Sequence, residues 1–375
     1  MNRLKFKVLG VLLLTSTLVQ AAGLQIVVQN PSEFDRSHEL VELPLTKLEN
    51  WIQLKEGEVY EVHNRKQEIV PSQVTSDGLL LFQSGLRQNE TATFTVVSGA
   101  KQEFAPKTYG RFIQERKDDF AWENDRVAFR IYGQALIPVD GPSNGLDVWY
   151  KRTNALVVDK WYKNDLENHI PYHNDNGEGL DDYKVGRTLG AGAMAPYPQD
   201  QLVLNENFVT PQVIENGPLR TTFKLIYKPV VVDGKTYAES RTFSIDAGSQ
   251  LTKVVQEYGF DTPTPVAAGI VKRDTQDRPI IASDKSYILY QEPATDKASG
   301  VTIAVLYPAG FDKTVVHSDG TSHILGVTTY QPNMPVTYYT GYNWSEFGFK
   351  TVDEFQHYLE KFKARLAKPF IVTIK

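Results

Sequence analysis

The 375-residue chain has no cysteine, few methionines and no long hydrophobic run beyond its first twenty residues. The lack of cysteine excludes disulfides, cysteine-based metal sites and a lipid anchor on cysteine. A chain of this length can bury a sufficient apolar core without such cross-links. The formal charge of −5 disfavours nucleic acid and anionic membranes as partners.

The first residues have the pattern of a secretory signal. Three basic residues precede an apolar stretch over residues 8–19, and Val19-Gln20-Ala21 fits the small-residue cleavage rule. The apolar stretch is too short to span a bilayer well. We therefore expect residues 1–21 to be a signal peptide, and the mature chain to be a secreted, periplasmic protein without membrane insertion.

Familiar catalytic motifs are missing as well. The sequence holds no His-Glu-x-x-His, nucleophile elbow or phosphate-binding glycine loop. Gly190-Ala191-Gly192 imitates a dinucleotide fingerprint, but no βαβ pattern surrounds it. Function must therefore be read from less regular segments.

Strand patterns dominate the chain. Residues 24–29 and 221–227 alternate between apolar and polar, which is the period of a half-buried strand. Asp233-Gly234-Lys235 reads as a hairpin turn into a strand over residues 237–245. Residues 301–307 are nearly all apolar, as in a strand buried on both faces. The pattern predicts an all-β fold, a large antiparallel β-sandwich.

One amphipathic helix is predicted near the C-terminus. Thr351 and Glu354 form a capping box, and an apolar stripe of packing residues ends before Pro369. A weak boundary near residues 99–107 divides the mature chain. We expect N-terminal strands or an accessory β-sheet over residues 22–105 and the sandwich, with the site, over residues 106–375.

The densest polar segment runs over residues 172–197 and reads YHNDNGEGLDDYKVGRTLGAGAMAPY. Its many glycines and polar side chains predict a surface loop, and loops carry function on a rigid scaffold. It offers a base, an acid and metal ligands within a short span. The alternative is a polar loop that ties itself down with turns and salt bridges.

A second segment, residues 109–132, supplies positive charge for an acidic ligand. Arg111, Arg116 and Arg130 lie in it, and arginine forks bind carboxylates in two-point geometry. The acidic residues of the same segment could instead neutralise them. Trp122, in this segment, and Trp344 sit among polar and small residues, and sugar rings stack on such side chains.

Five stretches together carry a family resemblance: YGRFIQERKDDFAWENDRVAFR, NGLDVW, the 172–197 segment, NGPLRTTF and FSIDAGSQL. They resemble an uncharacterised-domain family of exported bacterial proteins from polysaccharide-utilisation loci. Residues 243–251 look like a strand–turn–strand of the galactose-mutarotase-like supersandwich. The resemblance implies a carbohydrate-active protein, similar to dehydratases that act on uronic acids at the ends of ulvan oligosaccharides.

Loss of water across C4–C5 of a terminal uronate requires a base for the C5 proton, a cation beside the carboxylate and an acid for the departing hydroxyl. We assign these roles as a hypothesis. The base is His173 or Lys184, the carboxylate binds Arg116 or Arg187, and the acid is Tyr183. Substrate contacts are expected from Trp122, Tyr172, Arg111, Arg130 and Trp344.

Other readings stay open. A divalent metal near His173, Asp175 and Glu178 could replace arginine as the neutralising group, although no cofactor is required. A sugar epimerase or mutarotase-like enzyme would use the same fold without forming an alkene. A non-catalytic oligosaccharide-binding protein would need only the aromatics and arginines, and a structural protein would need neither.

Overall fold

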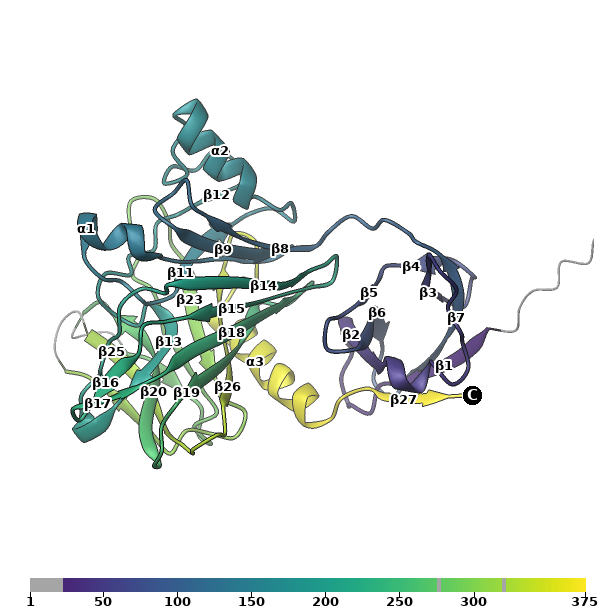
Figure 1. The fold of residues 1–375 in the computed structure, drawn as a ribbon. Helices are drawn as coiled ribbons and strands as arrows, with labels where there is room; N and C mark the ends of the chain where they lie inside the picture. The colour runs from purple at the N-terminus through teal and green to yellow at the C-terminus, as the bar shows by residue number, and fades with distance from the viewer. Residues whose placement is uncertain (1–22, 275–277, 319–321) are drawn as a thin grey trace, which may run out of the picture.

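The computed structural model describes residues 23–274, 278–318 and 322–375. Residues 1–21, expected to be a signal peptide, lie outside the described part. The described chain forms two units, a small N-terminal β-sandwich and a larger β-structure, joined by the extended segment after β7 (Figure 1). The predicted all-β sandwich with an amphipathic C-terminal helix is confirmed.

The small unit is a sandwich of two antiparallel sheets around its own apolar core. One sheet has the order β27-β1-β7-β3-β4 and the other the order β2-β6-β5. The strands are β1 (Leu24–Gln29), β2 (Arg36–Pro44), β3 (Glu58–His63), β4 (Ile69–Val70), β5 (Ser72–Val74), β6 (Leu79–Leu86), β7 (Thr91–Ala100) and β27 (Ile371–Ile374), with the short 3-10 helix η1 (Leu45–Lys47). The last strand of the chain therefore pairs with the first, so both ends of the described chain lie in this unit (Figure 1).

The large unit contains an eight-stranded sheet, a five-stranded sheet and a four-stranded sheet. The eight-stranded sheet has the order β14-β15-β18-β19-β26-β23-β22-β21. Its strands are β14 (Thr210–Asn216), β15 (Arg220–Ile226), β18 (Glu239–Asp246), β19 (Leu251–Tyr258), β21 (Ile280–Ile281), β22 (Tyr287–Gln291), β23 (Val301–Leu306) and β26 (Val336–Trp344). The strands predicted around residues 221–227, 237–245 and 301–307 belong to this sheet.

Two further sheets complete the large unit. The five-stranded order is β12-β11-β10-β9-β8, with β8 (Thr108–Ile113), β9 (Asp119–Asn124), β10 (Ala128–Ile131), β11 (Asp147–Lys151) and β12 (Gly179–Leu180). The four-stranded order is β13-β20-β25-β24, with β13 (Ala191–Pro196), β20 (Thr264–Lys272), β24 (Lys313–Val316) and β25 (Ser322–Tyr330). The predicted turn at Asp233-Gly234 joins the small hairpin of β16 (Val230–Val232) and β17 (Lys235–Tyr237).

The expectation of a loop over residues 172–197 is wrong for its second half. Residues 191–196 form β13, whose six residues are all buried against β20. Gly192 has a φ of +116° and a built Cβ would lie 2.1 Å from the Thr340 hydroxyl oxygen. The glycines thus permit a close approach of strands, which a sequence pattern cannot distinguish from a flexible loop.

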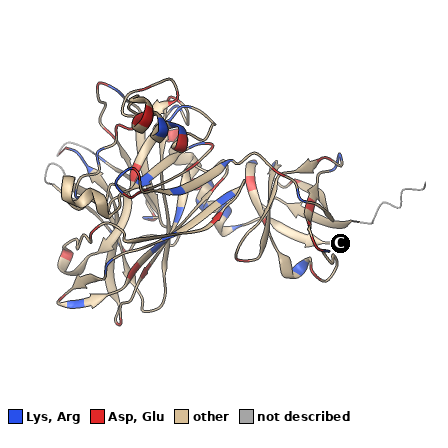
Figure 2. Ribbon diagram, turned by 45° about the horizontal axis from the view of Figure 1, so that its top comes forward, with Lys and Arg blue, Asp and Glu red and all other residues tan. Residues whose placement is uncertain are grey.

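Three α-helices are present among the described residues: α1 (Ile137–Asp140), α2 (Val158–Asn168) and α3 (Val352–Ala367), with 3-10 helices η2 (Gln134–Leu136) and η3 (Pro198–Asp200). The predicted capping box of α3 is present, and its apolar stripe packs on the eight-stranded sheet. The sequence pattern did not predict α2, which buries only Val158, Trp161 and Tyr162 and carries charges of both signs elsewhere (Figure 2).

Candidate active site

The candidate site is built where residues 172–184 cross the edge of the five-stranded sheet. Gly179 and Leu180 pair with β11, and the main-chain NH of Asp181 donates to the carbonyl of Tyr172. These hydrogen bonds hold the two ends of the loop together. Side chains on opposite sides of the loop therefore have different neighbours. Asp181 points towards Arg130, whereas Asp182 lines a cavity on the other side.

Arg130, on β10, is the centre of a buried ionic network. Its guanidinium donates to Asp147 and, at 2.7 Å, to Asp181, and both carboxylates are buried. It also donates to the hydroxyls of Tyr132 and Tyr172, at 3.1 and 3.0 Å. With these four partners Arg130 has its hydrogen-bonding capacity committed within the protein. Its expected role as a substrate contact is therefore replaced by a structural one.

Arg116 extends this network towards solvent. Its Nε donates to the Tyr172 hydroxyl at 3.1 Å, and its Nη1 lies 3.7 Å from the carboxylate of Asp119. The side chain is 19% exposed, although Nη1 itself is buried and makes no hydrogen bond within the described chain. Unlike Arg130, whose side chain is 3% exposed, Arg116 therefore keeps part of its side chain in contact with solvent, where an anionic ligand can reach it.

His173 lies beside the same network. Its ring packs on Tyr172 with a centroid distance of 4.6 Å, and its Nδ1 lies 3.1 Å from the carbonyl oxygen and 3.3 Å from Oδ2 of Asp181. The side chain is half exposed. Because Nδ1 is held by Asp181, the other ring nitrogen is the one available to solvent or a ligand. The structure thus brings His173, Tyr172 and Arg116 together from two distant sequence segments.

The charges of this network do not balance. Among the residues that the structure describes, the carboxylates of Asp119, Asp147 and Asp181 face two guanidiniums, those of Arg116 and Arg130. Burial raises the pKa of Asp119 to about 6 and that of Asp181 to about 8, with the nearby charge of Asp147 adding to both. A proton bound by one of these acids avoids a buried surplus negative charge.

The His173 imidazole is kept neutral. Partial burial lowers its pKa, and the positive charges of Arg130 and Arg116 act in the same direction. A neutral imidazole with one nitrogen held and the other accessible is the form required of a general base.

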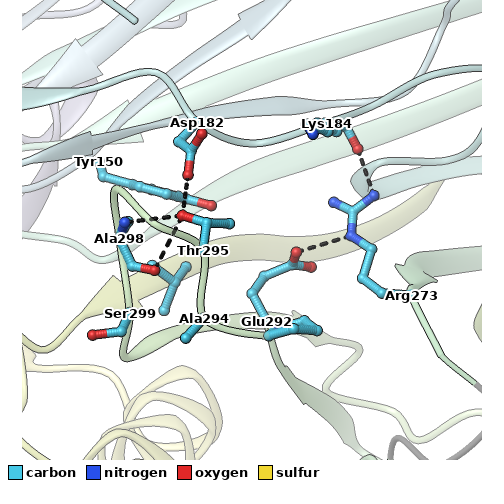
Figure 3. Close-up of a pocket in the computed structure, with 11 residues that line it drawn as sticks. Tyr150, Asp182, Lys184, Arg273, Glu292, Ala294, Thr295, Ala298 and Ser299 are labelled. Atoms are coloured by element: carbon cyan, nitrogen blue, oxygen red, sulfur yellow. Dashed lines mark hydrogen bonds and ion pairs between the residues drawn. The ribbon is translucent and has the colours of Figure 1, made fainter. Parts of the chain in front are cut away.

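A cavity of about 210 Å³ lies on the other side of the loop. Figure 3 shows Asp182 accepting a hydrogen bond from the Thr295 hydroxyl, and Arg273 between the Lys184 carbonyl oxygen and the carboxylate of Glu292. Lys297, from the same loop as Thr295, donates to the carbonyl oxygen of His173 at 3.0 Å. The cavity is lined by charged side chains of both signs among apolar residues, and its lining is separate from the Arg130 network.

The remaining predicted catalytic residues are not gathered at His173. Lys184 lines the cavity, and Tyr183 is buried with its ring under the Arg273 guanidinium, 4.8 Å from ring centroid to Cζ. Burial raises the pKa of Tyr183 well above its ordinary value, and its hydroxyl makes no hydrogen bond within the described chain. Arg187 donates instead to the carbonyl oxygens of Pro142 and Leu204.

Four more expected substrate contacts need correction. Tyr172 is 2% exposed, and its hydroxyl accepts hydrogen bonds from Arg116 and Arg130. Trp122 is 0% exposed and stacks on Phe129 in the main core, so its faces are not open to a sugar. Trp344 is 4% exposed, and its indole NH donates to the Ser299 carbonyl. Arg111 forms ion pairs with Asp159 and Glu115. The polar and small residues next to each tryptophan in the sequence do not indicate that both indole rings are buried in the folded chain.

The possible metal site is not formed. Asp175 accepts hydrogen bonds from the main chain of Gly177 and pairs with Arg152, while Glu178 pairs with Lys160. Among residues 23–274, 278–318 and 322–375, no group of three metal-ligating side chains gathers. The loop therefore ties down Asp175 and Glu178, as the structural alternative predicted.

Asp147 and Arg273 were not predicted from the sequence, and Asp181 had no expected role. Asp147 begins β11 within NGLDVW, and its partner Arg130 is 17 residues earlier, so only the β10–β11 pairing brings them together. Arg273 follows β20, where no local pattern marks it. The sequence did offer one signal for Asp181. Neighbouring residues of an extended segment point to opposite sides, so Asp181 and Asp182 could be expected to have different surroundings.

The chain is similar to a family of unknown function, to an uncharacterised relative and to solved structures. A family model described as "Domain of unknown function (DUF4861)" matches residues 28–372. "Uncharacterized protein P7" of Formosa agariphila is 29% identical, with 93% of each chain covered. A glycosyl hydrolase family 38 protein from Enterococcus faecalis has a TM-score of 0.56 at 10% identity, and an alpha-mannosidase from the same species has 0.50 at 9%.

The two solved structures show likeness of fold alone. The chain is covered to 95% in both cases, but it spans only about half of each, 48% and 46%. In the described part of the chain, no helix has the length and apolar character needed to cross a membrane.

Proposed function

The chain belongs to the DUF4861 family, and we propose that it is a carbohydrate-active lyase that removes water from a uronic acid at the end of an acidic oligosaccharide, such as one derived from ulvan. The observation that carries the proposal is the neutral, half-exposed His173, held at Nδ1 by Asp181 and close to the partly exposed side chain of Arg116. The fold likeness to glycosyl hydrolases supports a carbohydrate ligand.

The reaction requires an acidic proton at C5. Arg116 would bind the uronate carboxylate and neutralise it, so that the negative charge developing next to it costs less. His173 Nε2 would then take the C5 proton as general base. The electron pair of the broken C5–H bond forms the C4–C5 double bond as the C4–O bond breaks.

One residue can complete the step. The imidazolium of His173 gives its proton to the departing C4 hydroxyl, which leaves as water, so no oxidant or reductant is needed. This assignment replaces Tyr183 as the acid, because the Tyr183 side chain is buried in the main core with its ring under Arg273. The transient positive charge on His173 lies beside Asp181 and favours the ionised form of that carboxyl.

The secreted, periplasmic location belongs to the same proposal, since polysaccharide fragments are met outside the cytoplasm. The test is to incubate the purified protein with ulvan-derived oligosaccharides and to follow the absorbance of the conjugated alkene. An increase in absorbance that is lost when His173 is replaced supports the lyase. Exchange of the C5 hydrogen with solvent deuterium without any alkene would indicate the epimerase instead, and tight binding without either would indicate a binding protein.

A further inference from the structure

A second site lies between the two units, away from His173. It is a groove of about 490 Å³, lined by the start of β2, the turns β9–β10 and β18–β19, the segment after β26 and one side of α3. This volume is within the range of roughly 300–1,000 Å³ that small-molecule and cofactor sites occupy. Figure 1 shows α3 running from the large unit towards the small sandwich, so the groove joins both.

The floor of the groove contains an unsatisfied polar group. Gln250 lines the groove, is 8% exposed, and its main-chain NH donates to the Tyr358 hydroxyl at 3.1 Å. Its Oε1 is buried and accepts no hydrogen bond within the described chain. A buried acceptor without a donor costs free energy, so a ligand that brings a hydroxyl there would gain by satisfying it.

Aromatic rings line the same groove. Phe349 and Tyr358 lie with ring centroids 5.2 Å apart, and both are half-buried, as is Phe347. Lys361 lies over the ring of Phe34, 5.6 Å from its centroid. Rings that remain partly exposed beside polar groups offer the surface on which the apolar C–H faces of sugars pack.

The groove has a small net positive charge, because its lining holds five basic side chains and four carboxylates: Arg36, Lys107, Arg126, Lys361 and Arg365 against Asp35, Glu39, Asp125 and Glu354. Glu39 is paired with Arg36, whereas Asp35 and Asp125 accept hydrogen bonds from main-chain NH groups and keep their charge. Arg126 and Lys361 have no carboxylate partner in the part of the chain that the structure describes. Lys107 donates to the neutral Gln83 side chain at 2.6 Å.

We propose that this groove is a binding site for an acidic oligosaccharide, separate from the reacting site. Gln250 accepts a sugar hydroxyl, the rings of Phe349 and Tyr358 support sugar faces, and Arg126 and Lys361 attract carboxylate or sulfate groups. The choice of ligand rests on the proposed function, but binding in the groove does not require turnover. An acidic peptide would match the charges yet would not need the rings or the Gln250 acceptor.

The experiment measures binding, not turnover. The full chain is titrated calorimetrically with ulvan-derived oligosaccharides in the His173→Ala background, so that substrate is not consumed. Arg126→Glu with Lys361→Glu should weaken the affinity at least tenfold, and raising the salt concentration should weaken wild-type binding. A double change of the same charge at exposed residues outside the groove, Lys47→Glu with Lys66→Glu, should leave affinity unchanged.

A gentler variant protects the test against misfolding. Tyr358→Phe keeps the ring and should lower affinity only slightly, whereas Gln250→Leu removes the acceptor and should lower it about tenfold at unchanged thermal stability. Equal affinity in the charge-reversal and control variants overturns the groove proposal, as does equally tight binding of poly-glutamate. If no alkene ever forms but the groove variants still lose affinity, the proposed function fails and the groove stands.

Discussion

Nδ1 of His173 lies 3.3 Å from Oδ2 of Asp181 and 3.1 Å from the carbonyl oxygen of the same residue. This double contact fixes the imidazole on the rim of a buried network whose other members are held by Arg130. A ring so held presents one defined nitrogen to the outside. The relationship links a rigid, charged interior to a single solvent-facing base.

The first prediction concerns that base. His173→Ala should lower kcat for alkene formation at least about 100-fold, because general-base catalysis contributes roughly 10²–10⁴. The fold should be retained, since the side chain is half exposed. The matched control is His169→Asn, which changes an exposed histidine in the left-handed cap of α2. Full activity in His173→Ala would remove the proposed mechanism.

The second prediction separates the two sides of the loop. Lys184→Ala alters the cavity and Tyr183→Phe alters the core beneath Arg273, and both variants should retain most of the turnover if the reaction occurs at His173. Arg116→Gln should instead raise KM and lower kcat, because the carboxylate loses its neutralising cation. The measurement is initial alkene absorbance over a range of substrate concentrations. The reverse ranking would place the reacting site in the cavity beside Arg273.

The third prediction concerns the stability of the network. Arg130→Met leaves the buried carboxylates of Asp147 and Asp181 without their shared cation, and removing one partner of a buried ion pair costs about 3–5 kcal/mol. Urea unfolding should show a loss of this order. Arg111→Met, which breaks exposed pairs with Glu115 and Asp159, should change stability by less than about 1 kcal/mol. Equal losses would show that the buried network is not special.

Much of the fold was accessible from sequence because its signals are local. Alternation marked the strands around Leu24 and Thr221, and the capping box marked α3. The buried strand β13 and helix α2 were missed for physical reasons. In β13 the glycines allow strands to approach closely, and α2 has too narrow an apolar face to stand out.

The site was only partly predictable. Arg116 lies near Tyr172 and His173 in the structure, and all three belong to the two segments whose high content of polar and charged residues predicts a site. The pairing of Arg130 with buried carboxylates and the burial of Trp122 both depend on which face of a strand meets the core. That choice is made by the packing of other sheets, which the local sequence does not record.

The fourth prediction concerns the closing strand of the small unit. Truncation after Pro369 removes β27, whose residues pair with β1 and whose Val372 and Ile374 pack on the small core. The loss exposes the edge of β1, so we expect lower thermal stability of the small unit and a tendency to aggregate. Light scattering and proteolysis would detect both. Val372→Thr with Ile374→Thr, which keeps the main-chain pairing, should show a smaller effect.

The final prediction is a dependence of stability on pH. Burial raises the pKa of Asp119 to about 6 and of Asp181 to about 8, above the ordinary value near 4. The folded state therefore binds protons that the unfolded state has released, and this stabilisation is complete below about pH 4 and lost as the pH rises towards 8. The free energy of unfolding should thus fall across this window.

Asp119→Asn isolates one part of that dependence. The amide cannot ionise, so the fall between about pH 4 and 6 should shrink by on the order of 2 kcal/mol, because one pKa unit corresponds to about 1.4 kcal/mol. Asp159→Asn changes an exposed carboxylate and should leave the slope as in wild type. Urea unfolding at pH 4, 6 and 8 measures the free energy of unfolding of each variant across this window. An identical slope in Asp119→Asn and wild type would show that Asp119 is ionised throughout and that Arg116 and Arg130 outweigh its burial.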